Sequence, residues 1–233
     1  MSAIQAVVFD LDGVLVDSEH VWDEVREELA RERGGRWHDR AQADMMGMSS
    51  PEWSRYMHDV VGLVEAPEDI NDEVVRRLLA RYAVELPLID GAVEAVERLA
   101  GSFRLAVASS SNRTVIDAVL AESGLAPLFH ATVSSEEVAR GKPAPDVFLE
   151  AARRLDVAPR ACAAIEDSAN GIRAARAAGM RVLAVPNRRY PPSSEALEHA
   201  DEVLPSLVML TPSVIRGHAK GADASEARSS RHV

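Results

Sequence analysis

The feature that most constrains the fold is a regular alternation of strand-like and helix-like segments that begins near residue 88. Short apolar runs such as FRLAVAS and CAAIE alternate with helical stretches such as GAVEAVERLAG and APDVFLEAARRLD. Apolar runs without a polar face are typical of strands that are buried on both sides of a sheet. The alternation therefore predicts an α/β fold in which a parallel sheet carries helices on both faces.

The segment before residue 88 has a different pattern. The N-terminal run AIQAVVF is typical of a strand, and we assign it to the same sheet. After it, Val21, Val25 and Leu29 recur every four residues, and a second helical face includes Val74 and Leu78. This all-helical stretch predicts a cap domain inserted after the first strand. The predicted boundaries are residues 1–16 and 88–211 for the core, residues 17–87 for the helical cap, and residues 212–233 for a disordered tail with little to bury.

The composition excludes several classes of function. The formal net charge is -11 and the sequence pI is about 5.1, which argues against broad nucleic-acid binding because that needs a basic face. No apolar run is long enough to span a bilayer, no signal peptide is visible, and a single cysteine, Cys162, rules out a disulfide framework. We expect a cytoplasmic monomer with no membrane or nucleic-acid partner. A small anionic substrate is compatible with the charge, because a few local cations can dominate a pocket.

Polar side chains follow the ends of four predicted strands. Carboxyl ends of parallel strands meet at one edge of a sheet, so these side chains are expected to converge on one crevice. A solitary Asp or Ser after a strand is often only a cap or turn residue, and we assign Ser168 and Asp17 to that role. The presence of polar residues at four strand ends together indicates a functional site instead. Its members are Asp10 and Asp12; Ser109, Ser110, Ser111 and Asn112; Lys142; and Glu166 and Asp167.

The charges of this set predict a bound cation. Two carboxylates at one strand end and two at another repel each other unless a positive charge lies between them, and Lys142 is the cation near by. Oxygen ligands favour Mg²⁺, which also binds substrate phosphate. Of the 26 basic residues only two are lysine. A lysine at position 142 therefore indicates that a compact point charge is required there.

Asp10 and Asp12 are two residues apart in a tight loop, so they can do different jobs. One carboxylate can attack phosphorus to form an aspartyl-phosphate. The other can donate a proton to the leaving oxygen and then take one from water. Lys142 and the metal can neutralise the phosphoryl oxygens, and Ser109 with nearby backbone N–H groups can bind them.

The four strand ends resemble the four motifs of the haloacid dehalogenase superfamily. DLDGVLVDS is similar to the first motif, Ser109 to the second, Lys142 in GKPAPDVF to the third, and Glu166-Asp167 in IEDSANGI to the fourth. The resemblance covers the chain up to about residue 210 and implies a Rossmann-like three-layer core with a helical cap. It implies that Asp10 is the nucleophile and Asp12 the general acid/base. It also implies Mg²⁺ held by Asp10, the backbone carbonyl of Asp12, and Asp167, with Glu166 in support.

Within this superfamily the sequence is similar to the β-phosphoglucomutase-like branch, which includes sugar-phosphate phosphatases and mutases. The mutases have a histidine at the position of Trp22 and a phosphate-binding arginine at the position of Ser50, and both are absent here. The stretch DSEHVW is more similar to the sugar and polyol phosphatases. The turn GMSS matches the specificity loop of the branch. The residues expected to bind substrate are thus Gly47, Ser49, Ser110, Ser111, Asn112 and Lys142.

The resemblance therefore implies a Mg²⁺-dependent phosphatase that hydrolyses a small sugar or polyol phosphate through an aspartyl-phosphate. The alternative is an isomerase of the β-phosphoglucomutase type. Dehalogenases of the family lack the second acidic residue, and phosphonoacetaldehyde hydrolase needs a cap lysine that residues 17–87 do not contain. A non-catalytic module on the same fold ranks last, because Asp10, Asp12 and Lys142 are all intact.

Overall fold

A parallel β-sheet forms the centre of the molecule. The computed structural model describes residues 3–46, 48–187 and 191–217. Within these residues the sheet has six strands in the order β3-β2-β1-β4-β5-β6, and every neighbouring pair is parallel. This arrangement confirms the predicted α/β class. The strands are β1 (Ala6–Phe9), β2 (Arg104–Ser109), β3 (Ala131–Ser134), β4 (Cys162–Glu166), β5 (Arg181–Ala184) and β6 (Glu202–Val203).

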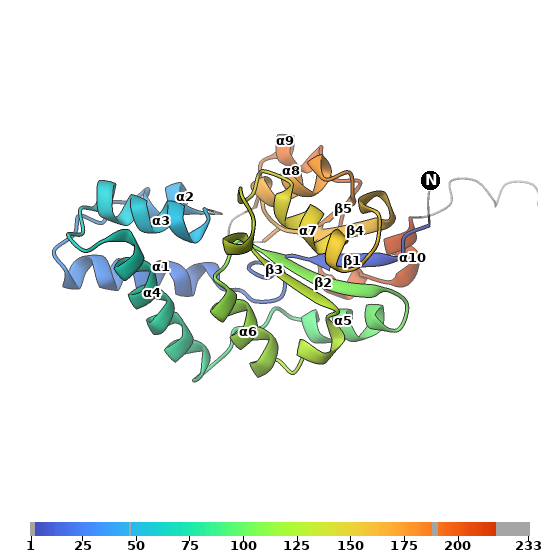
Figure 1. Cartoon of the computed structure of the whole chain (residues 1–233), viewed down its shortest axis with the longest axis horizontal. Coiled ribbons are helices and arrows are strands. Elements are labelled where there is room, and N and C mark those ends of the chain that lie inside the picture. The colour runs from blue at the N-terminus through green and yellow to red at the C-terminus, as the bar shows by residue number, and fades with distance from the viewer. Residues whose placement is uncertain (1–2, 47, 188–190, 218–233) are drawn as a thin grey trace, which may run out of the picture.

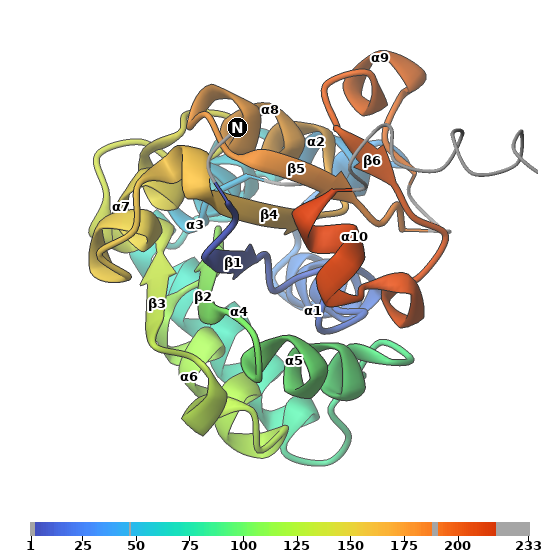
Figure 2. The same ribbon diagram turned by 90° about the vertical axis from the view of Figure 1, so that its right-hand side faces the viewer.

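Helices cover both faces of this sheet, as Figure 2 shows. One face carries large side chains such as Phe9, Leu105 and Ile165, which pack on α5 (Ala92–Ala100) and α6 (Arg113–Glu122). The opposite face consists mainly of alanines and packs on α7 (Asp146–Arg154) and α8 (Ala169–Ala177). Successive strand residues alternate between the two faces, so the central strands β1 and β4 are buried on both sides, whereas the edge strand β6 is partly exposed. Cys162, in β4, is fully buried as predicted.

The remaining helical elements of the core are short. They are α9 (Ser194–Leu197), α10 (Pro212–Arg216) and the 3₁₀ turns Ala126–Leu128, Ser135–Glu137, Pro159–Ala161 and Leu207–Met209. Helix α10 contradicts the prediction that the disordered tail begins at residue 212. Thr211 caps this helix by accepting a hydrogen bond from the Val214 N–H, and Ile215 is buried in the main hydrophobic core. The rest of the predicted tail, residues 218–233, lies outside the described residues.

Residues 17–87, which we call the helical insertion, lie to one side of the sheet (Figure 1). The insertion joins the core through two adjacent segments. The Asp17 N–H donates to the Pro87 carbonyl at 2.8 Å, and the Ile89 N–H donates to the Leu15 carbonyl at 3.0 Å. Its elements are α1 (Glu19–Glu32), α2 (Ala41–Met45), α3 (Ser50–Tyr56), a π-helical turn (Met57–Val61) and α4 (Pro67–Tyr82).

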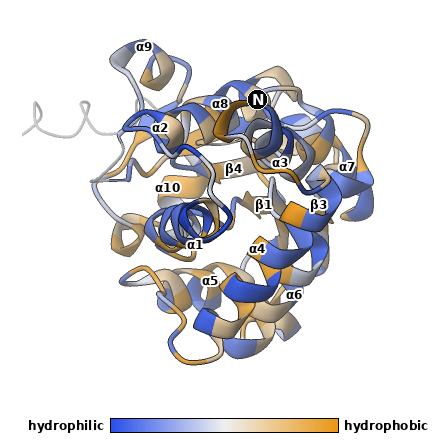
Figure 3. Cartoon of the chain, turned by 90° about the vertical axis from the view of Figure 1, so that its left-hand side faces the viewer, coloured by the Kyte–Doolittle hydropathy of each residue, from blue (hydrophilic) through white to orange (hydrophobic). Residues whose placement is uncertain are grey.

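Helices α1 and α4 divide their surfaces between the core and the solvent. The residues at helical spacing in the sequence, such as Val25, Leu29 and Leu78, are buried. The outer face of α1 is strongly hydrophilic (Figure 3), and there Arg81 of α4 reaches Glu24 and Glu28 of α1 at 2.8 and 2.7 Å. Such exposed ion pairs contribute little each, so the buried apolar contacts dominate the stability of this pair of helices.

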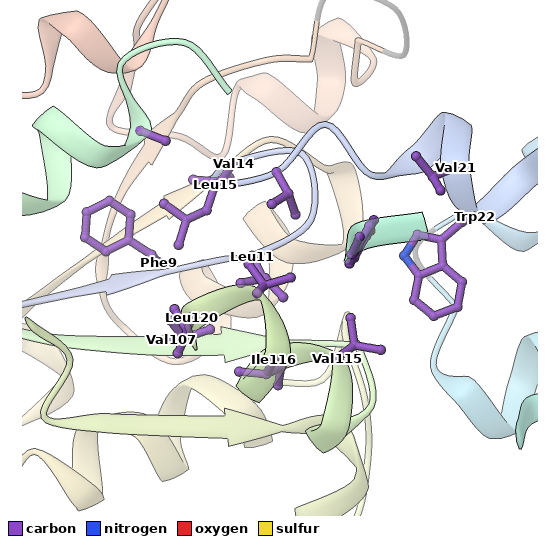
Figure 4. Packing of buried hydrophobic residues seen from close by; sticks show 14 of the residues in the cluster. Phe9, Leu11, Val14, Leu15, Val21, Trp22, Val107, Val115, Ile116 and Leu120 are labelled. Carbon is purple, nitrogen blue, oxygen red and sulfur yellow. The ribbon is translucent and has the colours of Figure 1, made fainter. Parts of the chain in front are cut away.

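The hydrophobic core is continuous from the sheet into the insertion. Figure 4 shows the side chains of Leu11 and Leu15 over Val107 and Ile116, with Trp22 of α1 farther along the same cluster. The insertion is therefore packed on the core through side chains that follow β1 directly in the sequence.

No helix among the described residues has the length and apolar content needed to cross a membrane.

Two leucines on the α7 side of the sheet provide a test of this packing. Leu155, the C-cap residue of α7, is fully buried, whereas Leu149 within this helix is 41% exposed. Leu155→Ala should lower the free energy of unfolding by about 2–5 kcal/mol, because it leaves a cavity in a close-packed core. Leu149→Ala should change it by less than about 0.5 kcal/mol. Urea denaturation measures both, and equal losses would contradict the assigned packing.

Candidate active site

The sheet register brings the predicted strand ends together. Phe9 of β1 is level with Val107 of β2 and with Ile165 of β4, and the Asp10 N–H donates to the Ile165 carbonyl at 2.9 Å. Asp10 therefore leaves the sheet beside Glu166. The sequence could predict this meeting because neighbouring parallel strands end at the same edge.

A cluster of three buried carboxylates lies at this edge. One oxygen from each of Asp10, Glu166 and Asp167 falls within 4.8 Å of the others. Lys142, from the segment after β3, places its Nζ 2.8 Å from Asp10 Oδ1 and 2.6 Å from Glu166 Oε1. Three carboxylates thus share one ammonium group, and the cluster carries an excess of negative charge.

The pKa values of these groups reflect that excess. Burial, followed by the charge of Glu166, raises the pKa values of Asp10 and Asp167 well above those of ordinary carboxyl groups. Burial alone would lower the pKa of Lys142, but the charges of Asp10 and Glu166 outweigh burial and raise it. An all-oxygen set of this kind fits a hard divalent cation, which would lower the raised carboxyl pKa values.

Glu166 has a supporting position in this cluster. Its Oε2 accepts hydrogen bonds from the Asp167 N–H, the Ser168 N–H and the Ser168 hydroxyl, each at 3.0 Å, and its Oε1 accepts from Lys142. Ser168 also caps α8, as predicted, by accepting from the Gly171 N–H. The oxygens of Glu166 are therefore occupied by protein donors, whereas Asp10 and Asp167 line the adjacent cavity.

Two glycines make room for the carboxylates, and the sequence analysis did not single them out. Gly13 has φ +78°, and a Cβ there would lie 2.0 Å from Asp167 Oδ2. A Cβ on Gly171 would lie 1.7 Å from Glu166 Oε1. The sequence has a glycine close to each acidic motif. It does not show that the backbone at this glycine packs against a carboxylate, because that contact depends on the tertiary structure.

Asp12 lies next to this cluster and is held by four side-chain donors. Ser111 Oγ and Ser18 Oγ each donate at 2.6 Å, Trp22 Nε1 at 3.1 Å and Ser109 Oγ at 3.3 Å. Ser109 ends β2 and Ser111 follows it, whereas Ser18 and Trp22 belong to the start of the insertion. The second carboxylate of the predicted pair is thus fixed jointly by the core and the insertion.

A cavity of about 350 Å³ opens above these groups, between the core and the insertion. Of the predicted site residues, those that line it are Asp10, Asp12, Ser110, Ser111, Lys142 and Asp167. Ser109 and Glu166 lie behind them. The insertion adds lining residues that were not among the predicted site residues, and they are Glu19, Trp22, Arg26, Ala43, Met45, Met46, Met48, Ser50 and Trp53.

Two residues predicted to bind substrate, Asn112 and Ser49, do not line the cavity, and a third is not described. Asn112 accepts from the Ser50 hydroxyl at 2.7 Å and donates to Glu136 Oε1 at 2.7 Å, so its amide bridges the core and the insertion outside the cavity lining. Ser49 forms the capping box of α3 with Glu52. Gly47 lies outside the described residues. Binding of substrate by these three stays a prediction.

The fold and this site correspond to a known class of enzymes. A family model described as haloacid dehalogenase-like hydrolase matches residues 4–179. The chain belongs to this family, which confirms the assignment made from the four motifs.

Similar proteins narrow the class to its sugar-phosphate phosphatase branch. The chain is 34% identical to fructose-1-phosphate phosphatase YqaB of Escherichia coli over 77% of its length and 95% of that protein. It is 34% identical to hexitol phosphatase B of Escherichia coli over 78% of its length and 84% of that protein. The crystal structure of CbbY from Rhodobacter sphaeroides in complex with phosphate superposes with a TM-score of 0.79 at 29% identity, covering 89% of this chain and 96% of that one.

Lys142 is the residue through which the electrostatics of the site can be tested. In metal-free protein, Lys142→Met should lower the free energy of unfolding by about 3–5 kcal/mol at neutral pH, because it leaves buried carboxylates without their cation. Arg140→Met, which removes an exposed cation paired with Asp146 in the same segment, is the matched control and should cost less than about 1 kcal/mol.

The pH dependence of this loss has a defined sign. The folded-state pKa values of Asp10 and Asp167 are raised, so these groups take up protons early as the pH falls. The deficit of Lys142→Met relative to wild type should therefore shrink as the pH falls below neutral, since protonation removes the unpaired charge. A deficit that does not change as the pH falls would mean that Lys142 acts through packing alone.

Proposed function

We propose that this protein is a Mg²⁺-dependent phosphatase that hydrolyses a sugar or polyol phosphate through an aspartyl-phosphate on Asp10. The observation that carries the proposal is the difference in environment between the two aspartates that follow β1. Asp10 faces the cavity beside Lys142 and Asp167, while Asp12 is held apart from them by four hydroxyl and indole donors. Two carboxylates in different environments suit two different roles.

Asp10 is placed to be the nucleophile. Its carboxylate attacks phosphorus, the bond from Asp10 to phosphorus forms, and the bond from phosphorus to the leaving alcohol breaks. Lys142 favours the ionised form of Asp10 and offers a positive charge to the phosphoryl oxygens, and the Ser110 and Ser111 segment lines the same space. Mg²⁺, held by Asp10, Asp167 and the backbone carbonyl of Asp12, would neutralise charge on the transferring phosphoryl group.

Asp12 is placed to move protons. In the first step its carboxyl proton goes to the oxygen of the leaving alcohol. In the second step its carboxylate takes a proton from a water molecule, whose oxygen attacks phosphorus, releases inorganic phosphate and restores Asp10. The donors Ser18, Trp22 and Ser111 fix the orientation of this carboxylate towards the cavity, and this kind of positioning lowers the cost of proton transfer.

Two observations support a sugar or polyol phosphate as the substrate. Relatives that share about a third of the sequence are named for fructose 1-phosphate and for hexitol phosphates. The cavity, at about 350 Å³, is at the small end of the range for ligand sites, and its lining combines polar groups with the rings of Trp22 and Trp53. Such a lining suits a compact polar molecule with some C–H surface.

The cavity also supports hydrolysis over isomerisation. Trp22 and Ser50 occupy the positions at which the resembling mutases have a histidine and a phosphate-binding arginine, and both residues line the cavity. An indole N–H that donates to Asp12 is not a proton acceptor, and a short hydroxyl carries no charge for a second phosphate. We therefore infer that water is the final acceptor of the phosphoryl group.

Phosphate release from a panel of sugar and polyol phosphates tests the proposed function. Wild-type protein should release phosphate with Mg²⁺ and stop when a chelator is added. Asp10→Asn should abolish turnover, and Asp12→Asn should lower kcat by about 10²–10⁴-fold, because it removes general acid–base catalysis. Asp17→Asn changes a half-exposed carboxylate of the same loop that does not line the cavity, and it should keep near wild-type activity.

Two results would contradict the proposal. Full activity of Asp10→Asn would exclude this residue as the nucleophile. Conversion of β-glucose 1-phosphate to glucose 6-phosphate on addition of a bisphosphate, without release of phosphate from the panel, would identify the protein as a mutase.

A further inference from the structure

Arg26 is the basic residue in the part of the cavity formed by the insertion, and the proposed chemistry does not use it. It lies on α1, lines the cavity and is only 7% exposed. Its guanidinium carbon is 4.9 Å from the ring centre of Trp22 and 4.7 Å from that of Trp53. The two ring centres are 5.8 Å apart, so both indoles contact the guanidinium from adjacent directions and stabilise its charge through cation–π contacts.

The donors of this guanidinium are unused. Arg26 makes no hydrogen bond and no ion pair within 4.0 Å to any residue that the structure describes, and its Nε is buried without a partner. Other arginines of the insertion, such as Arg77 and Arg81, pair with glutamates at 2.6–2.8 Å. A buried charge with free donors is costly unless a ligand completes its hydrogen bonds.

The carboxylates around Arg26 do not supply that partner. The charges that act on it are those of Glu19, Asp23, Asp12 and Tyr82. Asp23 lies outside the cavity lining, and Asp12 is held by its own four donors. Burial raises the pKa of Glu19 to about 7, whereas the pKa of Arg26, lowered by burial to about 10, keeps the guanidinium charged at neutral pH.

The position of Arg26 along α1 places it away from the reacting phosphate. Glu19, Trp22 and Arg26 follow one another at spacings of three and four residues, so they share one face of the helix. Arg26 lies two turns, roughly 10 Å, beyond Glu19, whose charge acts on Asp12 and Asp167. A ligand with its phosphate at Asp10 would therefore direct its other end towards Arg26.

We propose that Arg26 determines specificity by binding a carboxylate at the end of the substrate remote from the phosphate, so that the preferred substrate is an acyclic phosphorylated sugar acid. This inference rests on the proposed phosphatase function. The planar guanidinium offers a carboxylate two parallel hydrogen bonds along one edge, and the donors of Arg26 have no partner among the described residues. A second phosphate group suits the site less, because its larger charge would lie near Glu19 and Asp12.

A matched pair of substrates tests the proposal. 6-Phosphogluconate and glucitol 6-phosphate have the same carbon chain and phosphate, and they differ only in a carboxylate against a hydroxymethyl group at C1. Wild-type kcat/KM should favour the acid by about 10- to 100-fold, the value of a charge-assisted pair. Arg26→Met should bring this ratio towards 1, mainly through KM. Arg26→Lys should restore part of the preference.

A control variant and a binding measurement separate the possible outcomes. Arg31→Met removes an exposed arginine on the same helix, paired with Glu27, and should keep the wild-type ratio. Calorimetry on Asp10→Asn protein measures the affinity for both compounds without turnover, and the same preference should be seen there. Thermal melts of the Arg26 variants show whether they are folded.

Three results would overturn the inference. They are equal affinity of Asp10→Asn protein for the two compounds, an equal loss for both on Arg26→Met, and a preference for glucitol 1,6-bisphosphate over the acid. A preference in binding without phosphate release from either compound would count against the proposed phosphatase function and not against the role of Arg26.

Discussion

The structure depends on the electrostatics of one edge of the sheet, where three buried carboxylates share a single ammonium group. The parallel order of β1 and β4 brings Asp10 and Glu166 side by side, and the backbone of Gly13 closes over Asp167. Such a cluster opposes folding in the absence of a cation. The two hydrophobic layers on either side of the sheet must offset that cost, and the same deficit of positive charge makes the edge fit a divalent cation.

The core and the insertion contribute different parts of the site. The core supplies the buried acidic cluster and its lysine, since Asp10, Lys142 and Asp167 all come from segments that follow strands of the sheet. The insertion supplies the facing walls of the cavity, including Trp22 and Arg26. Asp12 is the point at which the two parts meet, because its donors come equally from both.

The sequence predicted those features that depend on local pattern. Apolar runs located the strands, and the polar residues that follow them located the site, because parallel strands end together. The sequence could not predict how side chains from distant segments meet. Helix α10 was missed because the anchoring of Ile215 depends on the tertiary core. The cation–π position of Arg26 was missed because Trp53 lies on another helix, and the bridging position of Asn112 because Ser50 does.

The two adjacent segments that connect the insertion to the core have an evolutionary consequence. Because the Asp17 N–H meets the Pro87 carbonyl, the chain leaves and re-enters the core at nearly one point. Residues 17–87 could therefore be exchanged through a single backbone junction, provided that the new segment also supplies donors to Asp12 equivalent to Ser18 and Trp22. Recombination at this junction would change the cavity walls that the insertion provides, while the strand ends that carry Asp10, Lys142 and Asp167 would stay in place.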